Sequence, residues 1–470
     1  MTVDLSALRS VGRSQLSMDL GRLRQTLNGV GDTLAQKNKE LEVVPSARRL
    51  MASLRDMGYE FSTAVSDLVD NSIEAGATRV TIDIEFDGDN SWVRIADNGC
   101  GMSPAQLREA MRYGSSNRDY GEEDLGKFGL GMKVASLSQC RSLSVASRTS
   151  RERADIAAYA WDLEHIDKED KWEILDLRET GVPTEMRDLL RDGPGTVVVW
   201  RRLDRLLGYQ HPYGEHARKR LSMMCREAET YLAMVFHRFL QGEVKARKKL
   251  KIMLNGNDID AWDPFCRTEP NTKKLSAVPI KVEHEGKSGY VLLEPYILPN
   301  QSKFSSAEAF KLASGPANWN QQQGFYIYRS DRLIQSGGWN RLRTPDEHTK
   351  LARIAVRFSP QLDDAFKVNV AKMRVQIPPQ ARDQIETATK SVIKLALEAY
   401  RKDPSPSPAT QSSSGNSSSN NAARQIEQPG RQPLTFRSLL KALLSVADSR
   451  EREVIKRVAA RLLKADQEAI

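Results

Sequence analysis

Four polar side chains suited to metal and proton chemistry occur within one short segment, in the order Asp67, Asp70, Asn71 and Glu74. On an α-helix these positions share one face. The amide oxygen of Asn71 can ligate Mg²⁺, and Asp67, one turn earlier, can orient or deprotonate a water molecule. Taken alone, such a stripe is also typical of a solvated acidic helix face, so its meaning depends on the residues that join it.

A second candidate is a carboxylate at the end of an expected strand. Asp97 follows the apolar run of Trp92 to Ile95 and is followed by Gly99 and Gly101. Glycine lets the backbone approach a ligand closely, and a carboxylate there can accept a hydrogen bond from an exocyclic amine. An Asn-Gly pair in a simple turn is the alternative interpretation.

A third candidate is the glycine cluster Gly126, Gly129 and Gly131, whose backbone N–H groups can converge on an anion ahead of a helix. The segment 121–127 matches GxxxxGK, but Phe128 stands where a P-loop requires a hydroxyl, and no GxGxxG pattern is present. We therefore exclude P-loop and Rossmann nucleotide sites. A fourth piece, Gly195-Thr196, opens an apolar strand.

The order and spacing of these four pieces resemble the GHKL ATPases, the superfamily of gyrase, the heat-shock chaperone, histidine kinases and MutL. The stretch SDLVDNSIEAGATRV at 66–80 is most similar to the MutL and MORC branches. DNGCGM at 97–102 resembles the adenine-side box, GKFGLGMKVAS at 126–136 the phosphate-side lid, and GTVVVW at 195–200 the last nucleotide strand.

The resemblance implies ATP with Mg²⁺ in a Bergerat-type α/β sandwich. Asp97, helped by Thr196, would bind the adenine amine, and Asn71 would hold Mg²⁺. Asp67 falls where MutL-like families place a glutamate general base, and it is shorter by one methylene, about 1.5 Å of reach. The nucleotide-binding residues implied by the boxes and the lid are Gly99, Gly101, Met102, Ser115, Ser116, Gly126, Lys127, Phe128, Gly129, Leu130 and Gly131.

Two later segments extend the resemblance. Residues 366–375 resemble the part of the MutL transducer domain that delivers a lysine to the γ-phosphate, which implies this role for Lys372, with Lys367 as the lesser candidate; an ordinary exposed lysine is the alternative. Such a lysine can distinguish ATP from ADP, because it contacts only the phosphate that hydrolysis removes. Residues 324–334 resemble a strand and turn of MORC-like proteins, and we favour a simple core role for them.

The elements that must position these residues follow from periodicity. Two helices, over about 46–57 and 60–75, precede a hairpin over 79–95, and this beginning predicts an α+β fold. Apolar runs predict the later strands, and the helical period predicts two later helices. The strands are expected near 142–147, 156–161, 196–200, 251–254, 291–293, 325–328 and 353–358, and the helices near 215–240 and 381–400.

We expect five segments along the chain. A helical N-terminal arm over 1–45 precedes the ATP-binding domain over 46–205 and a transducer-like α/β domain over 206–400. Residues 404–433 contain 8 Ser and 5 Pro, which cannot bury enough apolar surface to fold. We therefore expect a disordered linker over 401–433 and a C-terminal helical segment over 434–470.

Composition limits the remaining possibilities. Of 470 residues 40% are hydrophobic, as in a globular protein, and neither a membrane span nor a signal peptide is expected. The four cysteines are scattered and indicate reduced thiols in a cytoplasmic protein. The net charge is +9, and residues 201–251 hold 13 Lys and Arg against 5 Asp and Glu. This stretch favours duplex DNA as a partner, or forms a solvated helix face.

Together these features predict a Mg²⁺-dependent ATPase with slow turnover that acts as a conformational switch. By resemblance to its class it would form an ATP-dependent homodimer, acting in a DNA transaction such as repair, restriction or defence. A chaperone-like ATPase acting on protein partners, with the C-terminal helix as the contact, is the alternative. A nucleotide-regulated scaffold without turnover also stays open because of Asp67.

Overall fold

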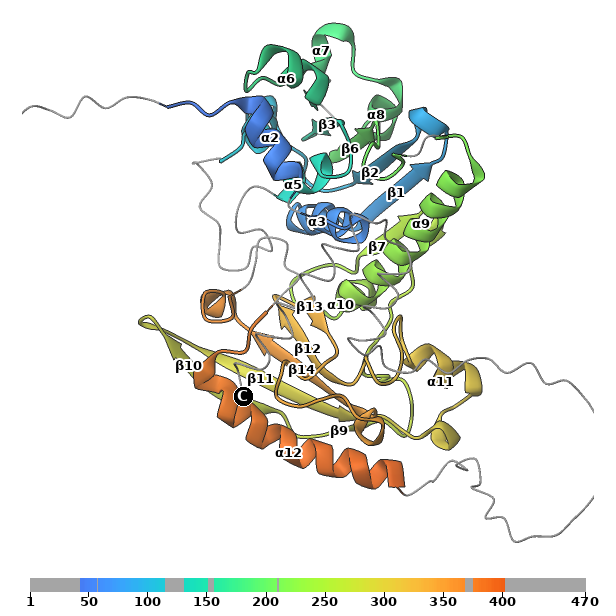
Figure 1. Cartoon of the computed structure of the whole chain (residues 1–470), viewed down its shortest axis with the longest axis vertical. Helices are drawn as coiled ribbons and strands as arrows, with labels where there is room; N and C mark the ends of the chain where they lie inside the picture. The colour runs from blue at the N-terminus through green and yellow to red at the C-terminus, as the bar shows by residue number, and fades with distance from the viewer. Residues whose placement is uncertain are drawn as a thin grey trace, which may run out of the picture. The chain divides into compact units, whose positions relative to one another are not determined.

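Two β-sheets, each covered by helices, make up the described part of the chain (Figure 1). The computed structural model describes residues 43–56, 58–114, 131–150, 156–208, 211–367 and 375–401. The mixed architecture, with largely antiparallel sheets, confirms the predicted α+β class and its ATP-binding α/β sandwich. The predicted arm, linker and C-terminal helix lie outside the described residues.

The first sheet has eight strands in the order β5-β4-β3-β6-β2-β1-β7-β8. Its pairs are antiparallel except for β1 with β7, which run parallel. The central pairing of β2 with β6 and of β6 with β3 places the ends of three strands next to one another. The strands are β1 Arg79–Glu85, β2 Trp92–Asp97, β3 Ser142–Arg148, β4 Ala157–Asp162, β5 Leu175–Asp176, β6 Gly195–Arg201, β7 Lys251–Leu254 and β8 Asn257–Asp258.

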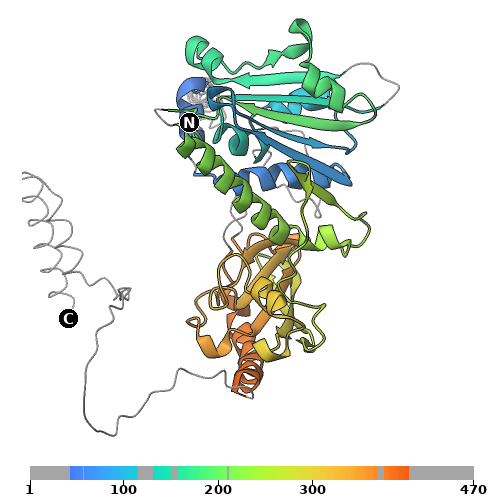
Figure 2. The same cartoon turned by 90° about the vertical axis from the view of Figure 1, so that its right-hand side faces the viewer.

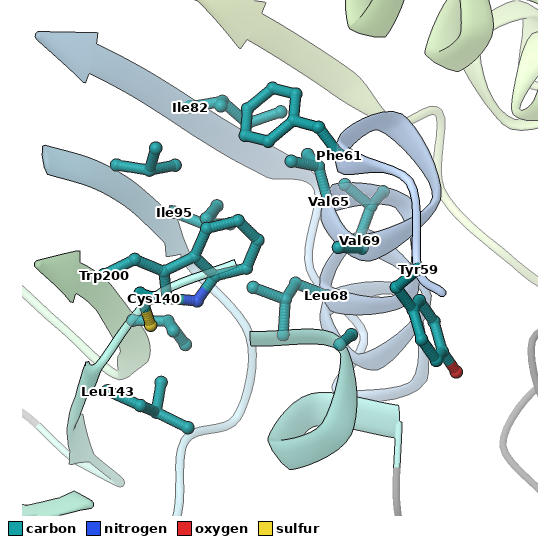
Figure 3. Close-up of a cluster of buried hydrophobic side chains, with 14 of the residues drawn as sticks. Tyr59, Phe61, Val65, Leu68, Val69, Ile82, Ile95, Cys140, Leu143 and Trp200 are labelled. Atoms are coloured by element: carbon teal, nitrogen blue, oxygen red, sulfur yellow. The ribbon is translucent and has the colours of Figure 1, made fainter. Parts of the chain in front are cut away.

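One face of this sheet carries the main core. Helix α3, Phe61–Glu74, turns Val65 and Leu68 toward Ile95 and Trp200, as Figure 3 shows. The ring of Phe61 meets that of Trp200 edge to face at 6.2 Å. Helix α9, Glu215–Val235, packs beside α3 on the same face (Figures 1 and 2). Burial of this apolar face is the main force that fixes α3 against the strands.

The opposite face is covered more lightly. On β6, Val198 and Trp200 point into the main core, whereas Val197 and Val199 point the other way, as the two-residue period of a strand requires. There they meet side chains of α8, Thr184–Leu189, and of the residues just after it. Burial on both faces explains why this strand is a continuous apolar run rather than an alternating one.

Local signals in the sequence set several helix ends. The Ser46 side chain accepts a hydrogen bond from the Arg49 N–H at the start of α2, Ala47–Arg55. Ser103 forms a complete capping box with Gln106 at the start of α4, Pro104–Met111. Gly76 has a φ of 72° just after α3 ends. Each of these helix ends depends on local chemistry alone, because the capping residue lies within a few positions of the end that it stabilises.

The second sheet has six strands in the order β10-β11-β14-β12-β13, with β9 paired to β11. Its one parallel pair is β12 with β14. The long helix α12, Pro379–Arg401, packs on β10, β11 and β14 through an apolar stripe that includes Ile385 and Val392. The strands are β9 Lys273–Lys274, β10 Val278–His284, β11 Lys287–Ile297, β12 Gly324–Arg329, β13 Arg332–Ser336 and β14 Ala352–Phe358.

The first sheet takes in strands from beyond residue 205, where the sequence placed the end of the ATP-binding domain. Strand β7 pairs with β1 from Arg79↔Lys251 onward, and the first core continues to Ile259. Pairing between segments so far apart along the chain leaves no local signal in the sequence, so neither motif spacing nor hydrophobic periodicity could predict the pairing of β1 with β7.

The remaining elements are short, and no helix among the described residues has the length and apolar character needed to cross a membrane. All described residues belong to one compact unit of the chain. The short helices are α5 Gly131–Leu137, α6 Leu163–Glu169, α7 Leu177–Thr180, α10 His237–Gln241, α11 Ala307–Ala313 and the 3₁₀ turns η1 Gly88–Asn90, η2 Gln301–Lys303, η3 Glu347–Thr349 and η4 Pro360–Leu362.

Candidate active site

Helix α3 places its polar side chains in different environments. Asp67 and Asp70 are buried, with 3% and 1% of their surface exposed, whereas Asn71 is exposed and Glu74 half-buried. The predicted single face of hard oxygens is therefore divided into a buried acidic pair and an accessible amide. Burial of two carboxylates on one helix requires nearby cationic or hydrogen-bonding partners.

Asp97, the last residue of β2, is held by hydrogen bonds on both carboxylate oxygens. The Gly99 N–H donates to Oδ1 at 2.8 Å, and the Ser72 hydroxyl donates to Oδ2 at 3.0 Å. Burial raises the pKa of Asp97, and the hydrogen bonds from Gly99, Ser72 and Thr196 oppose that rise. Because Ser72 follows Asn71 directly, this contact brings the predicted metal and adenine residues to the same place.

Thr196 lies opposite Asp97 in the register of β2 and β6. Its Oγ1 is 2.9 Å from Oγ of Ser147, a residue of β3. Ser147 Oγ also accepts from the Met102 N–H at 2.8 Å and donates to the Gly195 carbonyl at 2.9 Å. One serine hydroxyl of β3 thus joins two of the predicted nucleotide segments, 97–102 and 195–200, beside Asp97.

Two glycines of the predicted boxes are required by close backbone approach. A Cβ on Gly101, where φ is 66°, would lie 1.9 Å from the Arg148 carbonyl oxygen, and one on Gly195 would lie 2.2 Å from that of Asp97. No side chain fits at either position without moving the backbone. The glycines therefore allow the ends of β2, β3 and β6 to converge.

Asp67 lies near the start of α5. Its Oδ2 is 3.6 Å from the point that a Cβ on Gly131 would occupy. Figure 3 shows the aromatic ring of Tyr59 on the side of α3 that faces away from the strands. Burial raises the pKa of the Tyr59 phenol, and the negative charge of Asp67 raises it further. The predicted base and the first described residue of the phosphate-side lid are thus neighbours.

Several predicted site residues lie outside the described residues, and their roles stay predictions. They are Ser115, Ser116, Gly126, Lys127, Phe128, Gly129 and Leu130 of the predicted lid, and Lys372.

Comparison with known proteins agrees with this geometry. Residues 59–196 match the family described as histidine kinase-, DNA gyrase B-, and HSP90-like ATPase. These residues form a GHKL ATPase domain. A stretch of 103 residues is 38% identical to DNA mismatch repair protein MutL of Enterobacter sp. (strain 638) and 37% identical to that of Escherichia coli O1:K1 / APEC. The matched stretch is 21% of this chain and 17% of each relative, so the chain covers about a sixth of the length of these proteins.

The GHKL domain of this chain offers one accessible oxygen ligand for a divalent ion in the predicted place. Asp70 already accepts a hydrogen bond from Arg332, whereas the amide of Asn71 is exposed. The described residues contain no cluster of three His, Cys, Asp or Glu side chains fit to hold a metal. Mg²⁺ is commonly bound through one or two protein groups and substrate phosphates, and this donor set fits that mode.

Sequence reasoning missed three residues of the GHKL domain and its surroundings. Ser72 was part of the quoted motif but had no role assigned, and Ser147 belongs to a strand with no motif. Arg332 was placed in a segment interpreted as core, yet it contacts α3. A hydroxyl directly after the amide of Asn71, the predicted metal ligand, was a usable signal for Ser72. Nothing in the sequence indicated Ser147 or Arg332, because their partners lie far away along the chain.

Proposed function

We propose that the chain is a Mg²⁺-dependent ATPase whose nucleotide state controls its conformation. The GHKL domain and its likeness to MutL over that domain support ATP binding in general. The observation that carries the proposal is the placement of Asp97, a half-buried carboxylate fixed by Gly99 and Ser72 and facing Thr196 across the strands.

In this proposal each residue of the chain has a defined task. Asp97 accepts a hydrogen bond from the adenine amine, and Ser72 and Gly99 keep its oxygens oriented for that purpose. Asp67 orients a water molecule and accepts its proton, as a buried carboxylate beside the start of α5 can do. Lys372 contacts the terminal phosphate and reports its presence to the second sheet.

Asn71 would hold Mg²⁺ through its amide oxygen, and the bound ion would neutralise phosphate charge. Asp70 is excluded from that task by its ion pair with Arg332.

The test separates binding from hydrolysis. Titration calorimetry with ATP and a phosphate-release assay are run on the wild type, D97N and D67N. We expect D97N to weaken ATP binding by roughly ten- to a hundredfold, the worth of a hydrogen bond to a charged group. We expect D67N to keep ATP affinity and lose turnover.

The matched control is D83N, because Asp83 is a half-buried carboxylate of the same sheet that pairs with Arg94 at 2.9 Å, outside the candidate site. D83N should bind and hydrolyse ATP like the wild type. Equal ATP affinity in D97N and D83N would reject the proposed site, and unchanged turnover in D67N would remove Asp67 from the role of base.

Duplex DNA is the partner we propose, on the evidence of exposed basic side chains. Several basic residues of 201–251 already pair with acidic groups, among them Arg202 with Asp162 and Lys251 with Asp258. Other basic side chains on α9 and after α10 are exposed, namely Arg220, Arg226, Lys245, Lys248 and Lys249. These can contact phosphates without giving up an internal partner.

Binding to long duplex DNA across a salt series tests this partner. We expect affinity to fall steeply with salt. The triple variant K245A/K248A/K249A should reduce the salt slope by up to about one for each phosphate that is no longer neutralised. Binding that is absent or indifferent to salt would exclude DNA and favour protein clients.

A further inference from the structure

Arg332 is a buried arginine of the second sheet that reaches the helix of the candidate active site. It opens β13 and has 1% of its surface exposed. Its Nε donates to Asp70 Oδ1 at 2.8 Å, and its Nη2 donates to Ser66 Oγ at 3.1 Å. The same Nη2 lies 3.9 Å from Oδ1 of Asp67. One guanidinium therefore contacts three side chains within two turns of α3.

The geometry of this contact restrains α3 in more than one direction. A guanidinium is planar and presents its donors in a fixed fork, so two hydrogen bonds to Ser66 and Asp70 limit rotation of the helix about its axis. Asp67 follows Ser66, and Asn71 follows Asp70. A rotation or shift of α3 that broke the contacts of Arg332 would therefore move both of these predicted site residues.

The position of Arg332 is itself fixed by a short hairpin. Ser330 and Asp331 have φ values of 47° and 64°, which form the tight two-residue turn between β12 and β13. Asp331 accepts from Arg238 of α10 at 2.7 Å, and the guanidinium of Arg238 lies 3.8 Å from the centre of the Tyr328 ring. Adjacent residues of this hairpin thus contact different helices, α10 through Asp331 and α3 through Arg332.

A fully buried ion pair is a poor means of adding stability, because desolvation of both charges opposes their attraction. Asp70 and Arg332 each have side chains 1% exposed. Apolar residues of similar volume would hold α3 against β13 as well or better. The arrangement is therefore better explained by the orientation that it imposes on α3.

We propose that Arg332 is a positioning residue for ATP hydrolysis, holding Asp67 and Asn71 in place through Ser66 and Asp70. This makes turnover depend on the contact between β13 and α3, so the second sheet controls the chemistry carried out on the first. The inference rests on the proposed ATPase function.

The test compares two arginines that bridge the same hairpin. R332Q should lower kcat on the order of a hundredfold, as small displacements of catalytic groups do, with ATP affinity close to that of the wild type. R238Q removes the neighbouring ion pair to Asp331 but leaves α3 untouched, so its kcat should equal that of the wild type. R332K, which keeps the charge without the fork, should fall between them.

A double variant separates positioning from the burial of an unpaired charge. D70N/R332Q removes the charge of Asp70 together with that of Arg332, so its thermal stability should recover relative to R332Q while its kcat stays low. Wild-type kcat in R332Q or in D70N/R332Q, or equal reductions of kcat in R332Q and R238Q, would overturn the inference. A wild-type chain that neither binds nor hydrolyses ATP would instead overturn the proposed function, and the inference with it.

Discussion

The adenine-binding task proposed for Asp97 comes with a cost to the stability of the fold. Burial raises the pKa of this carboxyl above its ordinary value, and the hydrogen bonds from Gly99, Ser72 and Thr196 offset only part of that rise. At neutral pH the ionised carboxylate is therefore less favourable in the folded chain than in the unfolded one. A carboxylate whose ionised form is disfavoured by folding is typical of a binding site, where function rather than stability determines the residue.

We predict that D97N unfolds at higher denaturant concentration than the wild type at pH 7. The sign follows from linkage: an acid whose pKa is raised by folding binds more protons when folded, so the wild type gains stability as pH falls. The advantage of D97N should therefore shrink as pH falls through the folded-state pKa of Asp97. Urea unfolding from pH 7 to pH 4 measures it.

D83N is the control for that series, because its carboxylate pairs with Arg94 on the same sheet. An advantage of D97N that stayed constant with pH, or appeared equally in D83N, would contradict the assigned environment of Asp97.

Single residues were predictable from sequence where their neighbours along the chain carry the signal. Asp97, Thr196 and Asn71 belong to recognisable boxes, and the structure places Asp97 opposite Thr196 and next to the hydroxyl that follows Asn71. Arg332 was not predictable, because its partner Asp70 lies 262 residues earlier. Such a pairing depends on tertiary packing, and no local spacing or periodicity records it.

At the scale of elements, periodicity located the strands that alternate or run apolar, and it missed those that do not. Strand β14 matches the expected run at 353–358, but β11 extends from Lys287 to Ile297 rather than over 291–293. Its first half is exposed and polar, so only its pairing with β10 reveals it as a strand. Strand β10 is an exception, because buried Ile280 and Val282 alternate with exposed Lys281 and Glu283, yet no strand was predicted there.

Helix α5 contains a buried lysine whose protonation makes the stability of the fold depend on pH. Lys133 has 2% of its surface exposed, and its Nζ donates to the Ala110 carbonyl at 2.7 Å, near the end of α4. Burial lowers the pKa of Lys133 to about 8, against a smaller opposing effect of Glu109. An ammonium at the carboxyl end of a helix is favoured by the helix dipole, which explains why a lysine is tolerated there.

We predict that the wild type gains stability relative to K133M as pH rises from 7 to 10. In that range folded Lys133 releases its proton while the unfolded lysine keeps it, so the unfolded chain binds more protons and stability rises with pH. A lowering of the pKa from 10.5 to about 8 corresponds to at most roughly 3 kcal/mol. Denaturant unfolding at several pH values measures the difference.

The exposed Lys248 provides the matched control for this series. K248M should follow the wild type at every pH. Parallel curves for the wild type and K133M would mean that Lys133 is solvated or more strongly paired than its contacts indicate.

At the scale of the whole molecule, side chains of the second sheet contact helices that pack on the first sheet. The hairpin formed by β12, β13 and the turn between them presents Tyr328, Asp331 and Arg332 to helices of the first sheet. The Tyr328 hydroxyl lies 2.9 Å from Nε2 of His237, and burial lowers the pKa of His237, which keeps its imidazole neutral. Contacts from α10 and α3 to this single hairpin therefore connect helices of the first sheet to the second sheet.

We predict that a non-hydrolysable ATP analogue with Mg²⁺ doubles the mass of the chain in solution from 52.8 kDa, whereas ADP does not. The reason is energetic: a ligand shifts a conformational equilibrium only by its difference in affinity for the two states. The terminal phosphate is what ATP has and ADP lacks, so its contact with Lys372 would supply that difference. Light scattering coupled to size exclusion, with and without duplex DNA, measures the mass. D97N, which should bind the analogue poorly, should remain at the monomer mass under the same conditions, whereas D83N should dimerise like the wild type. One mass in all nucleotide states would indicate a static binder and contradict the switch.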